Sequence, residues 1–259
     1  MFEYPYLIEL LSPKRSDPDS VDDKGKVFSE RYHRVLDAGC GVSVPDNPMG
    51  QPRQALLDMI HRFELPVHPE KTVMNLNTFH EKQELDERLK AAAKAEIKYL
   101  LVIRGDGGPA LPKLDPKSIG GNLSIATTMD LLRYINRAYP GAFVTGAAFN
   151  PYNRASFEID RLKEKMEAGA KFVITQPVIG RDATVDRLGP FRIPVVLEAW
   201  MSKNVDLLFK SVRKQKDASA DAYDPVENLK RLHEAYPKSC IYLSMLGFKQ
   251  DWETMLPRI

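Results

Sequence analysis

The chain has 259 residues, 43% hydrophobic and 28% charged, which is enough to bury one large core and predicts a single domain over residues 1–259. Lys and Arg number 37 against 35 Asp and Glu. This balance, without a block of like charge, argues against nucleic acid or an anionic membrane as a partner but permits a small anionic ligand. The two cysteines, Cys40 and Cys240, and the five scattered histidines lack metal-ligand spacing, so neither a disulfide framework nor a metal site is predicted.

The first residues, MFEYPYLIELL, lack a basic start and a long apolar stretch. No other run approaches the length that spans a membrane. We therefore expect a cytoplasmic protein without a signal peptide.

Apolar runs typical of buried strands alternate with amphipathic helical segments, the pattern of a parallel sheet covered by helices. The predicted strands are Tyr6–Leu11, Arg34–Cys40, Thr72–Asn77, Tyr99–Ile103, Phe143–Ala148, Phe172–Gln176, Val195–Ala199 and Ile241–Met245. The predicted helices are Gln54–Phe63, Gln83–Ile97, Ser124–Ala138, Glu158–Gly169, Val205–Lys214 and, before the last strand, Pro225–Tyr236. The polar stretch Lys214–Asp221 is read as the approach to that extra helix, with a disordered surface loop as the alternative.

Eight strands with intervening helices predict an α/β fold of the (β/α)8 TIM-barrel type rather than a doubly wound sheet. The absence of a GxGxxG or Walker motif agrees with this choice. Two segments rich in Pro and Gly, residues 45–52 and 107–122, follow predicted strands and should form loops at the catalytic rim.

Polar residues at strand ends are the candidates for function, because the carboxyl ends of barrel strands carry the chemistry. Glu9 interrupts an apolar run, where burial would raise its pKa and suit a general acid; the alternative is an outward-facing Glu paired with a helix Lys. Arg104 and Asp106 follow a strand directly and either face a ligand together or form an ion pair at the rim. Gln176 could recognise a heterocycle edge or cap a loop.

Two further residues are weaker candidates. Glu198 lies near the end of the seventh strand and could line the pocket. Lys165 lies one helical turn from Arg161, a position equally typical of a solvated helix face.

Five segments in order carry a family resemblance: IELLSP, MNLNTF, the RGD after the fourth strand, AAFNPYNRA, and LKEKMEAGAKFVITQ. On these segments the chain resembles the methylenetetrahydrofolate reductases. The resemblance implies a TIM barrel that reduces 5,10-methylenetetrahydrofolate to 5-methyltetrahydrofolate with FAD, which is reduced by NADH or NADPH. A reduced folate is then the small-molecule substrate, and a homo-oligomer or a partner subunit remains open.

The resemblance also implies roles for individual residues. Glu9 would be the acid that opens the methylene bridge, Asp106 would lie near both flavin and pterin, and Gln176 would contact the folate or the nicotinamide. Glu9 and Asp106 are thus the implied catalytic residues. The implied cofactor-binding residues are Asn75, Arg104, Gly105, Asp106, Phe149, Asn153 and Lys165.

The chain departs from the family on the flavin side. Asn75 stands where a His is common, and Phe149 and Asn153 stand where an aromatic residue and a His are common. Three hypotheses follow: a flavin-dependent reductase, a flavin-independent enzyme that transfers hydride directly from the nicotinamide, and a non-catalytic folate-binding or partner subunit. Retention of Glu9 and Asp106 argues against the third.

Overall fold

Eight parallel strands close into a barrel in chain order, with the last strand paired to the first. The computed structural model describes residues 1–16, 21–212, 214–215, 223–248 and 251–257. The strands are β1 Tyr6–Glu9, β2 Gly41–Val44, β3 Thr72–Leu76, β4 Tyr99–Val102, β5 Val144–Phe149, β6 Phe172–Thr175, β7 Val195–Trp200 and β8 Ile241–Ser244. The predicted (β/α)8 TIM barrel is confirmed.

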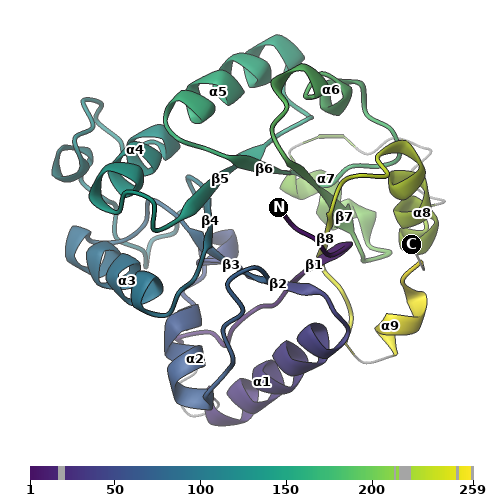
Figure 1. Cartoon of the computed structure of the whole chain (residues 1–259), viewed down its shortest axis with the longest axis horizontal. Coiled ribbons are helices and arrows are strands. Elements are labelled where there is room, and N and C mark those ends of the chain that lie inside the picture. The colour runs from purple at the N-terminus through teal and green to yellow at the C-terminus, as the bar shows by residue number, and fades with distance from the viewer. Residues whose placement is uncertain (17–20, 213, 216–222, 249–250, 258–259) are drawn as a thin grey trace.

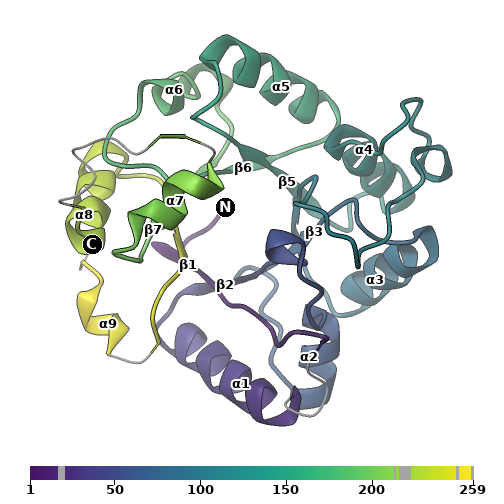
Figure 2. The same ribbon diagram turned by 180° about the vertical axis from the view of Figure 1, so that it is seen from behind.

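Helices form an outer ring around these strands (Figure 1), and the view from behind shows the same ring from the other end (Figure 2). The α-helices are α1 Val21–Asp37, α2 Leu56–Phe63, α3 Lys82–Lys94, α4 Thr128–Ala138, α5 Ala155–Glu167, α6 Ala183–Asp186, α7 Val205–Ser211, α8 Pro225–Ala235 and α9 Trp252–Met255. Short 3-10 turns are η2 Pro48–Gly50, η3 Pro116–Ile119 and η4 Gly189–Phe191.

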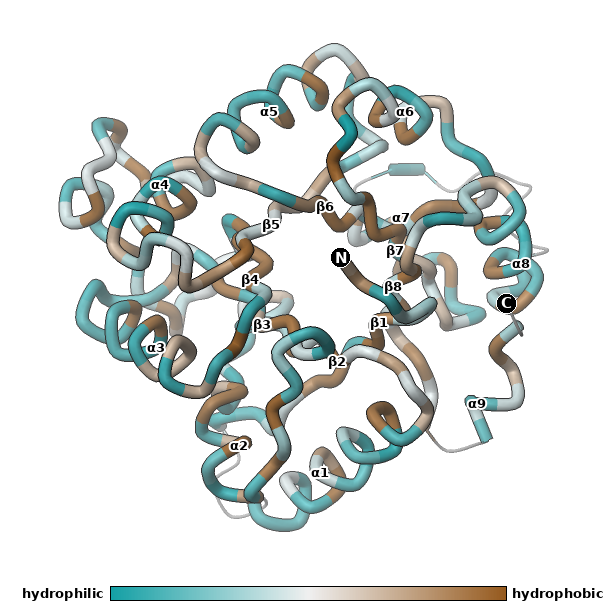
Figure 3. Tube along the Cα trace, in the orientation of Figure 1, coloured by the Kyte–Doolittle hydropathy of each residue, from teal (hydrophilic) through white to brown (hydrophobic). Residues whose placement is uncertain are grey.

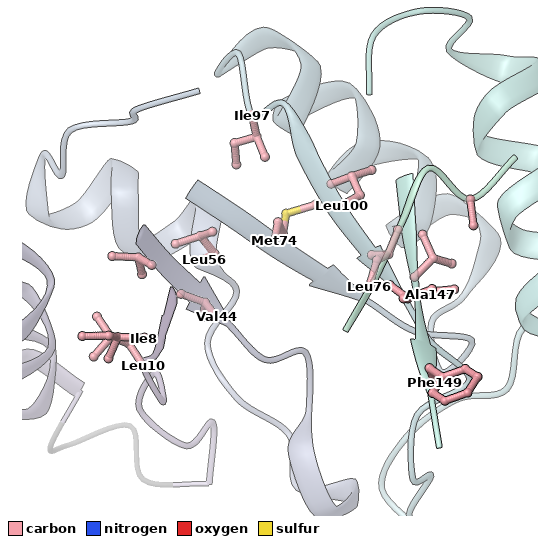
Figure 4. Packing of buried hydrophobic residues seen from close by; sticks show 14 of the residues in the cluster. Ile8, Leu10, Val44, Leu56, Met74, Leu76, Ile97, Leu100, Ala147 and Phe149 are labelled. Atoms are coloured by element: carbon pink, nitrogen blue, oxygen red, sulfur yellow. The ribbon is translucent and has the colours of Figure 1, made fainter. Parts of the chain in front are cut away.

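Side-chain alternation along the strands creates two separate apolar clusters. Leu7 packs with Val73 and Phe172 in one cluster, which fills the barrel interior. Ile8 belongs to the other, which lies between strands and helices and is shown in Figure 4. The hydropathy pattern agrees, since the strands are largely hydrophobic and the outer helices carry many hydrophilic positions (Figure 3). A residue's place in a strand therefore decides whether it faces the barrel axis or the helices.

The predicted strand Arg34–Cys40 is wrong. Residues 34–37 form the last turn of α1, and β2 begins only at Gly41. Phe28, Tyr32 and Val35 are buried at four- and three-residue spacing, which is a helical period that the many polar residues between them conceal. Gly39, with φ +76°, supports the turn between helix and strand.

The other boundaries shift by smaller amounts. The helix predicted from Ser124 begins at Thr128, because the Thr127 hydroxyl accepts a hydrogen bond from the Asp130 N–H in a capping box. Two helices, α7 and α8, separate β7 from β8 as predicted. Most of the stretch Lys214–Asp221 lies outside the described residues. Within the described part of the chain, no helix combines the length and apolar character needed to cross a membrane.

Candidate active site

An open cavity of about 840 Å³ lies over the carboxyl ends of β4, β5 and β6. Its volume is in the range of pockets that hold cofactors or drug-sized ligands. Its lining includes residues 102–106 and 123–128 together with Ala148, Asn150, Asn153, Phe157, Glu158, Arg161, Lys165, Gln176 and Ser211. The predicted residues Arg104, Gly105, Asp106, Asn153, Lys165 and Gln176 all belong to this lining.

The loop after β4 brings Asp106 to the mouth. Gly105 has φ +83°, and a Cβ there would meet the Asn77 Cβ at 2.9 Å, so this turn requires glycine. Asp106 is exposed and accepts a hydrogen bond of 2.8 Å from the Met49 N–H in the loop after β2. Arg104 is also exposed, and no ion pair joins it to Asp106 among the described residues. The described residues therefore do not show the alternative, a structural ion pair between Arg104 and Asp106.

A buried carboxylate on α5 organises the far side of the cavity. Glu158 is 3% exposed and accepts hydrogen bonds from the Asn150 N–H at 3.1 Å, Asn153 Nδ2 at 2.8 Å and Lys165 Nζ at 3.2 Å. Lys165 also donates to the Ala148 carbonyl at 2.7 Å. Burial lowers the pKa of Lys165, and the Glu158 charge opposes that shift. Lys165 is therefore no solvated surface residue, since its side chain is 12% exposed.

Glu158 was not among the predicted site residues. It lies seven positions before Lys165 on the same helix, a spacing that places two side chains on one helix face. This spacing was the signal available in the sequence. The structure adds that Lys165 and Asn153 each donate a hydrogen bond to Glu158, so these N–H groups do not point a free donor into the open cavity.

Two predicted cofactor contacts lie elsewhere. Ala148 lines the cavity, so its neighbour Phe149 faces the helices and is completely buried in the outer core (Figure 4). Asn75 faces the barrel axis from β3, is 6% exposed, and accepts a hydrogen bond of 3.1 Å from Ser43 Oγ. Neither residue belongs to the lining of the cavity.

Gln176 directly follows β6 and is partly exposed in the cavity. Its backbone N–H donates to the Phe149 carbonyl at 2.8 Å, which continues the β5–β6 pairing by one residue. The backbone thus secures the strand end while the amide side chain lines the cavity.

Glu9 lies at the end of β1, across the barrel from β4 and β5, and is not part of the cavity lining. It has the same strand parity as Leu7 and so faces the barrel axis. The Tyr242 hydroxyl donates to Glu9 Oε2 at 2.7 Å. Burial raises the pKa of Glu9, and the Tyr242 hydrogen bond and the charge of Arg53 only partly oppose this. The alternative of an outward-facing Glu9 is wrong.

A second acid lies beside Glu9. Glu198 on β7 pairs in register with Tyr242 on β8, and β8 pairs in turn with β1. Burial, and then the charge of Glu9, raises the pKa of Glu198 to about 8. Tyr242 and Arg53 are the further residues here that the sequence did not single out. Closure of the barrel brings β8 to β1, and the pairing of β1 with β2 brings the loop after β2 there.

The described residues contain no group of three or more His, Cys, Asp or Glu side chains placed to hold a metal ion. The charged groups instead form two sets: a cationic and amide set around the cavity, and an acidic set on β1 and β7. The chain is thus an α/β barrel whose candidate site lies at the carboxyl ends of the strands, where TIM barrels carry their active sites.

Comparison with known proteins agrees with that class and narrows it. Residues 6–186 match the family model of methylenetetrahydrofolate reductase, and the chain belongs to this family. Methylenetetrahydrofolate reductase 1 of Schizosaccharomyces pombe is 29% identical over 155 residues, covering 54% of this chain and 24% of that protein. Methylenetetrahydrofolate reductase 2 of the same organism is 32% identical over 104 residues, covering 36% of this chain and 15% of that protein. The matches thus span about a quarter or less of these relatives.

Among solved structures, an uncharacterized protein from Clostridium thermocellum superposes with a TM-score of 0.58 at 11% identity, covering 96% of this chain and 91% of that one. It is described as binding two copies of 5-methyl-5,6,7,8-tetrahydrofolic acid. At this identity the likeness establishes the shared barrel fold.

Proposed function

We propose that this chain reduces 5,10-methylenetetrahydrofolate to 5-methyltetrahydrofolate with hydride from NADH or NADPH. The observation that carries the proposal is Glu9, a carboxyl group on the barrel axis that accepts a hydrogen bond from Tyr242 and whose pKa is raised by burial, as suits a general acid. Family membership supplies the reaction class. The folate-bound barrel of the Clostridium thermocellum protein supports a folate as the ligand of this fold.

The proposed roles of the side chains are those that the family resemblance implies. Glu9 donates its proton to N10 of the folate as the bond between N10 and the methylene carbon breaks, which leaves a cationic iminium at N5. Asp106 provides a negative charge at the mouth that favours this cation. Gln176 offers both a donor and an acceptor to an edge of the pterin or nicotinamide ring. These groups orient the reactants and supply one proton, while the cofactor supplies the hydride.

The cavity also fits the flavin that the family implies. Its volume of about 840 Å³ accommodates a large cofactor, and the exposed Arg104 offers a cation for a diphosphate. The lining residues Thr127 and Thr128 are the N-cap and the first residue of α4, and backbone N–H groups at a helix start favour anions. FAD bound there would pass hydride from the nicotinamide to the folate.

A second candidate is direct hydride transfer from nicotinamide to folate without a flavin. Three observations favour it. Phe149 is buried against the helices. Asn75 accepts a hydrogen bond from Ser43, and Asn153 donates one to Glu158. Three of the seven expected cofactor-binding residues therefore present fewer groups to a bound flavin than the family pattern implies.

Absorbance of the purified protein separates these functions. A flavin spectrum bleached by NADH or NADPH and restored by methylenetetrahydrofolate is the expected result. A colourless protein that oxidises the nicotinamide only when the folate is present would select direct transfer. Folate binding with neither colour nor turnover would refute a reductase and leave a non-catalytic folate-binding protein.

The role of Glu9 has its own test. Glu9→Gln should slow folate reduction by about 100-fold or more, the usual contribution of general acid catalysis, and leave reduction of the cofactor by nicotinamide unchanged. Glu234→Gln, which alters an exposed residue of α8, is the matched control. Equal losses in both half-reactions would contradict the assignment.

A further inference from the structure

Glu198 is a partly buried acid that the proposed mechanism does not yet use. It lies on β7 facing the barrel axis, with the same parity as Val196 of the interior cluster. Its backbone is held on both sides: its N–H donates to Thr175 Oγ1 at 3.0 Å, and its carbonyl accepts from the Val178 N–H at 2.8 Å. These two contacts fix the backbone of Glu198, and strand parity then directs its side chain toward the barrel axis.

The groups around Glu198 come from four elements. β8 contributes Tyr242, which pairs in register with Glu198, and Ser244, whose hydroxyl lowers the pKa of Glu198 in part. β1 contributes Glu9, and the loop after β5 contributes Tyr152, whose hydroxyl donates to the Pro177 carbonyl at 2.7 Å. The charge of Arg53 acts on Glu9. In the part of the chain that the structure describes, no Lys, Arg or His forms an ion pair with Glu198.

Such a placement is costly for stability. Two carboxyl groups that share one low-dielectric region cannot both ionise easily, so one of them keeps a proton at neutral pH. A partly buried acid with a strongly raised pKa and no ion-pair partner, at the carboxyl end of a barrel strand, is a typical feature of a functional site. Tyr242 lies within electrostatic reach of both acids and already donates to Glu9.

We propose that Glu198 is a second proton-carrying residue of this site, which returns a proton to Glu9 after each turnover. The proposal rests on the proposed folate reduction. Glu9 and Glu198 form the carboxyl pair.

The proton balance is complete. The Glu9 proton moves to N10 as the bond from N10 to the methylene carbon breaks, and hydride from the nicotinamide, directly or through the flavin, adds to that carbon to form the methyl group. Glu9 is then a carboxylate. It takes the proton of Glu198 through water in the mouth, and Glu198 takes one from solvent. Each turnover thus consumes one hydride and one solvent proton.

The arrangement explains why a second acid is useful. When folate and hydride donor cover the mouth, solvent protons no longer reach Glu9 freely. A protonated Glu198 beside Tyr242 provides a local proton and, by remaining neutral, adds no negative charge next to the newly formed Glu9 carboxylate. Its proton is available up to the pH at which Glu198 itself ionises.

Infrared spectroscopy of the intact protein tests the protonation without any turnover. The wild-type protein should show a protonated-carboxyl band that disappears as the pH rises through about 8. This band should be absent in Glu198→Gln and unchanged in Glu234→Gln. A wild-type protein without a band that disappears near pH 8, or a Glu198→Gln protein that keeps a band with this same titration, would overturn the proposal.

The pH dependence of folate reduction tests the relay. In Glu198→Gln we expect the rate constant to fall about tenfold with KM for the folate unchanged, and the limb near pH 8 to disappear from the profile. Reduction of the bound cofactor should not change. A merely structural role would alter KM or both half-reactions and keep the pH profile, and that result would overturn the proposal alone. A wild-type protein that has the band but never reduces the folate would overturn the proposed function and, with it, the relay.

Discussion

Replacing Glu198 by Gln should change how stability depends on pH. Gln keeps the shape and hydrogen-bonding capacity of the side chain but cannot ionise. In the wild-type protein, burial and the neighbouring Glu9 raise the pKa of Glu198 from an ordinary 4.5 to about 8. Between these pH values the folded protein binds a proton that the unfolded chain releases. The unfolding free energy of the wild-type protein therefore falls as the pH rises through this window.

The size of the effect follows from the shift. Each pKa unit corresponds to about 1.4 kcal/mol, so a rise from 4.5 to about 8 sets a ceiling of about 5 kcal/mol. Glu198 is partly accessible through the open mouth, and water reduces the penalty. We therefore expect a fall on the order of 2–3 kcal/mol between pH 5 and 8.5.

Urea unfolding at closely spaced pH values measures this difference. Glu198→Gln should lose much of the decline, so that the variant is about as stable as the wild-type protein at pH 5 and more stable at pH 8.5. Some decline should persist because burial also raises the pKa of Glu9. Glu234→Gln should run parallel to the wild-type curve. Parallel curves for wild type and Glu198→Gln would refute the assigned protonation, whatever the activity of either protein.

Further predictions concern the cavity wall and its supports. Glu158→Ala should destabilise the fold by about 3–5 kcal/mol in urea unfolding, because it leaves the buried Lys165 charge without its partner; the double variant with Lys165→Met should recover part of the loss, and no recovery would contradict the pairing. Phe149→Ala should lower the free energy of unfolding by about 3–5 kcal/mol, because it leaves a cavity in the outer core. The affinity for flavin, measured by fluorescence titration, should not change. A large loss of affinity would show that Phe149 contacts the flavin. Gly105→Ala should weaken folate and cofactor binding, measured by calorimetry, because its positive φ and the contact with Asn77 hold the loop of Asp106; unchanged binding would show that the loop adapts.

The sequence by itself determined the barrel, because parallel strands buried on both faces appear as nearly continuous apolar runs with helical segments between them. It missed α1 and misplaced the second strand, because the buried residues of that helix are separated by many charged ones and its last apolar pair stands next to the strand. The polar strand ends could likewise be predicted, since they depend on local order along one strand, whereas Lys165 was singled out only by the family resemblance.

Only the tertiary structure decided which of those residues meet. Strand parity, set by the exact register of β5, turned Phe149 to the helices and Ala148 to the cavity. Closure of the barrel placed Tyr242 on β8, the strand paired with β1, and Glu198 on β7, one strand further, although both lie more than 180 residues after Glu9. These residues are far apart in the chain, so no local sequence pattern predicts that they lie close together. The electrostatics of the acidic set depends on their shared burial and therefore arises only when the barrel closes.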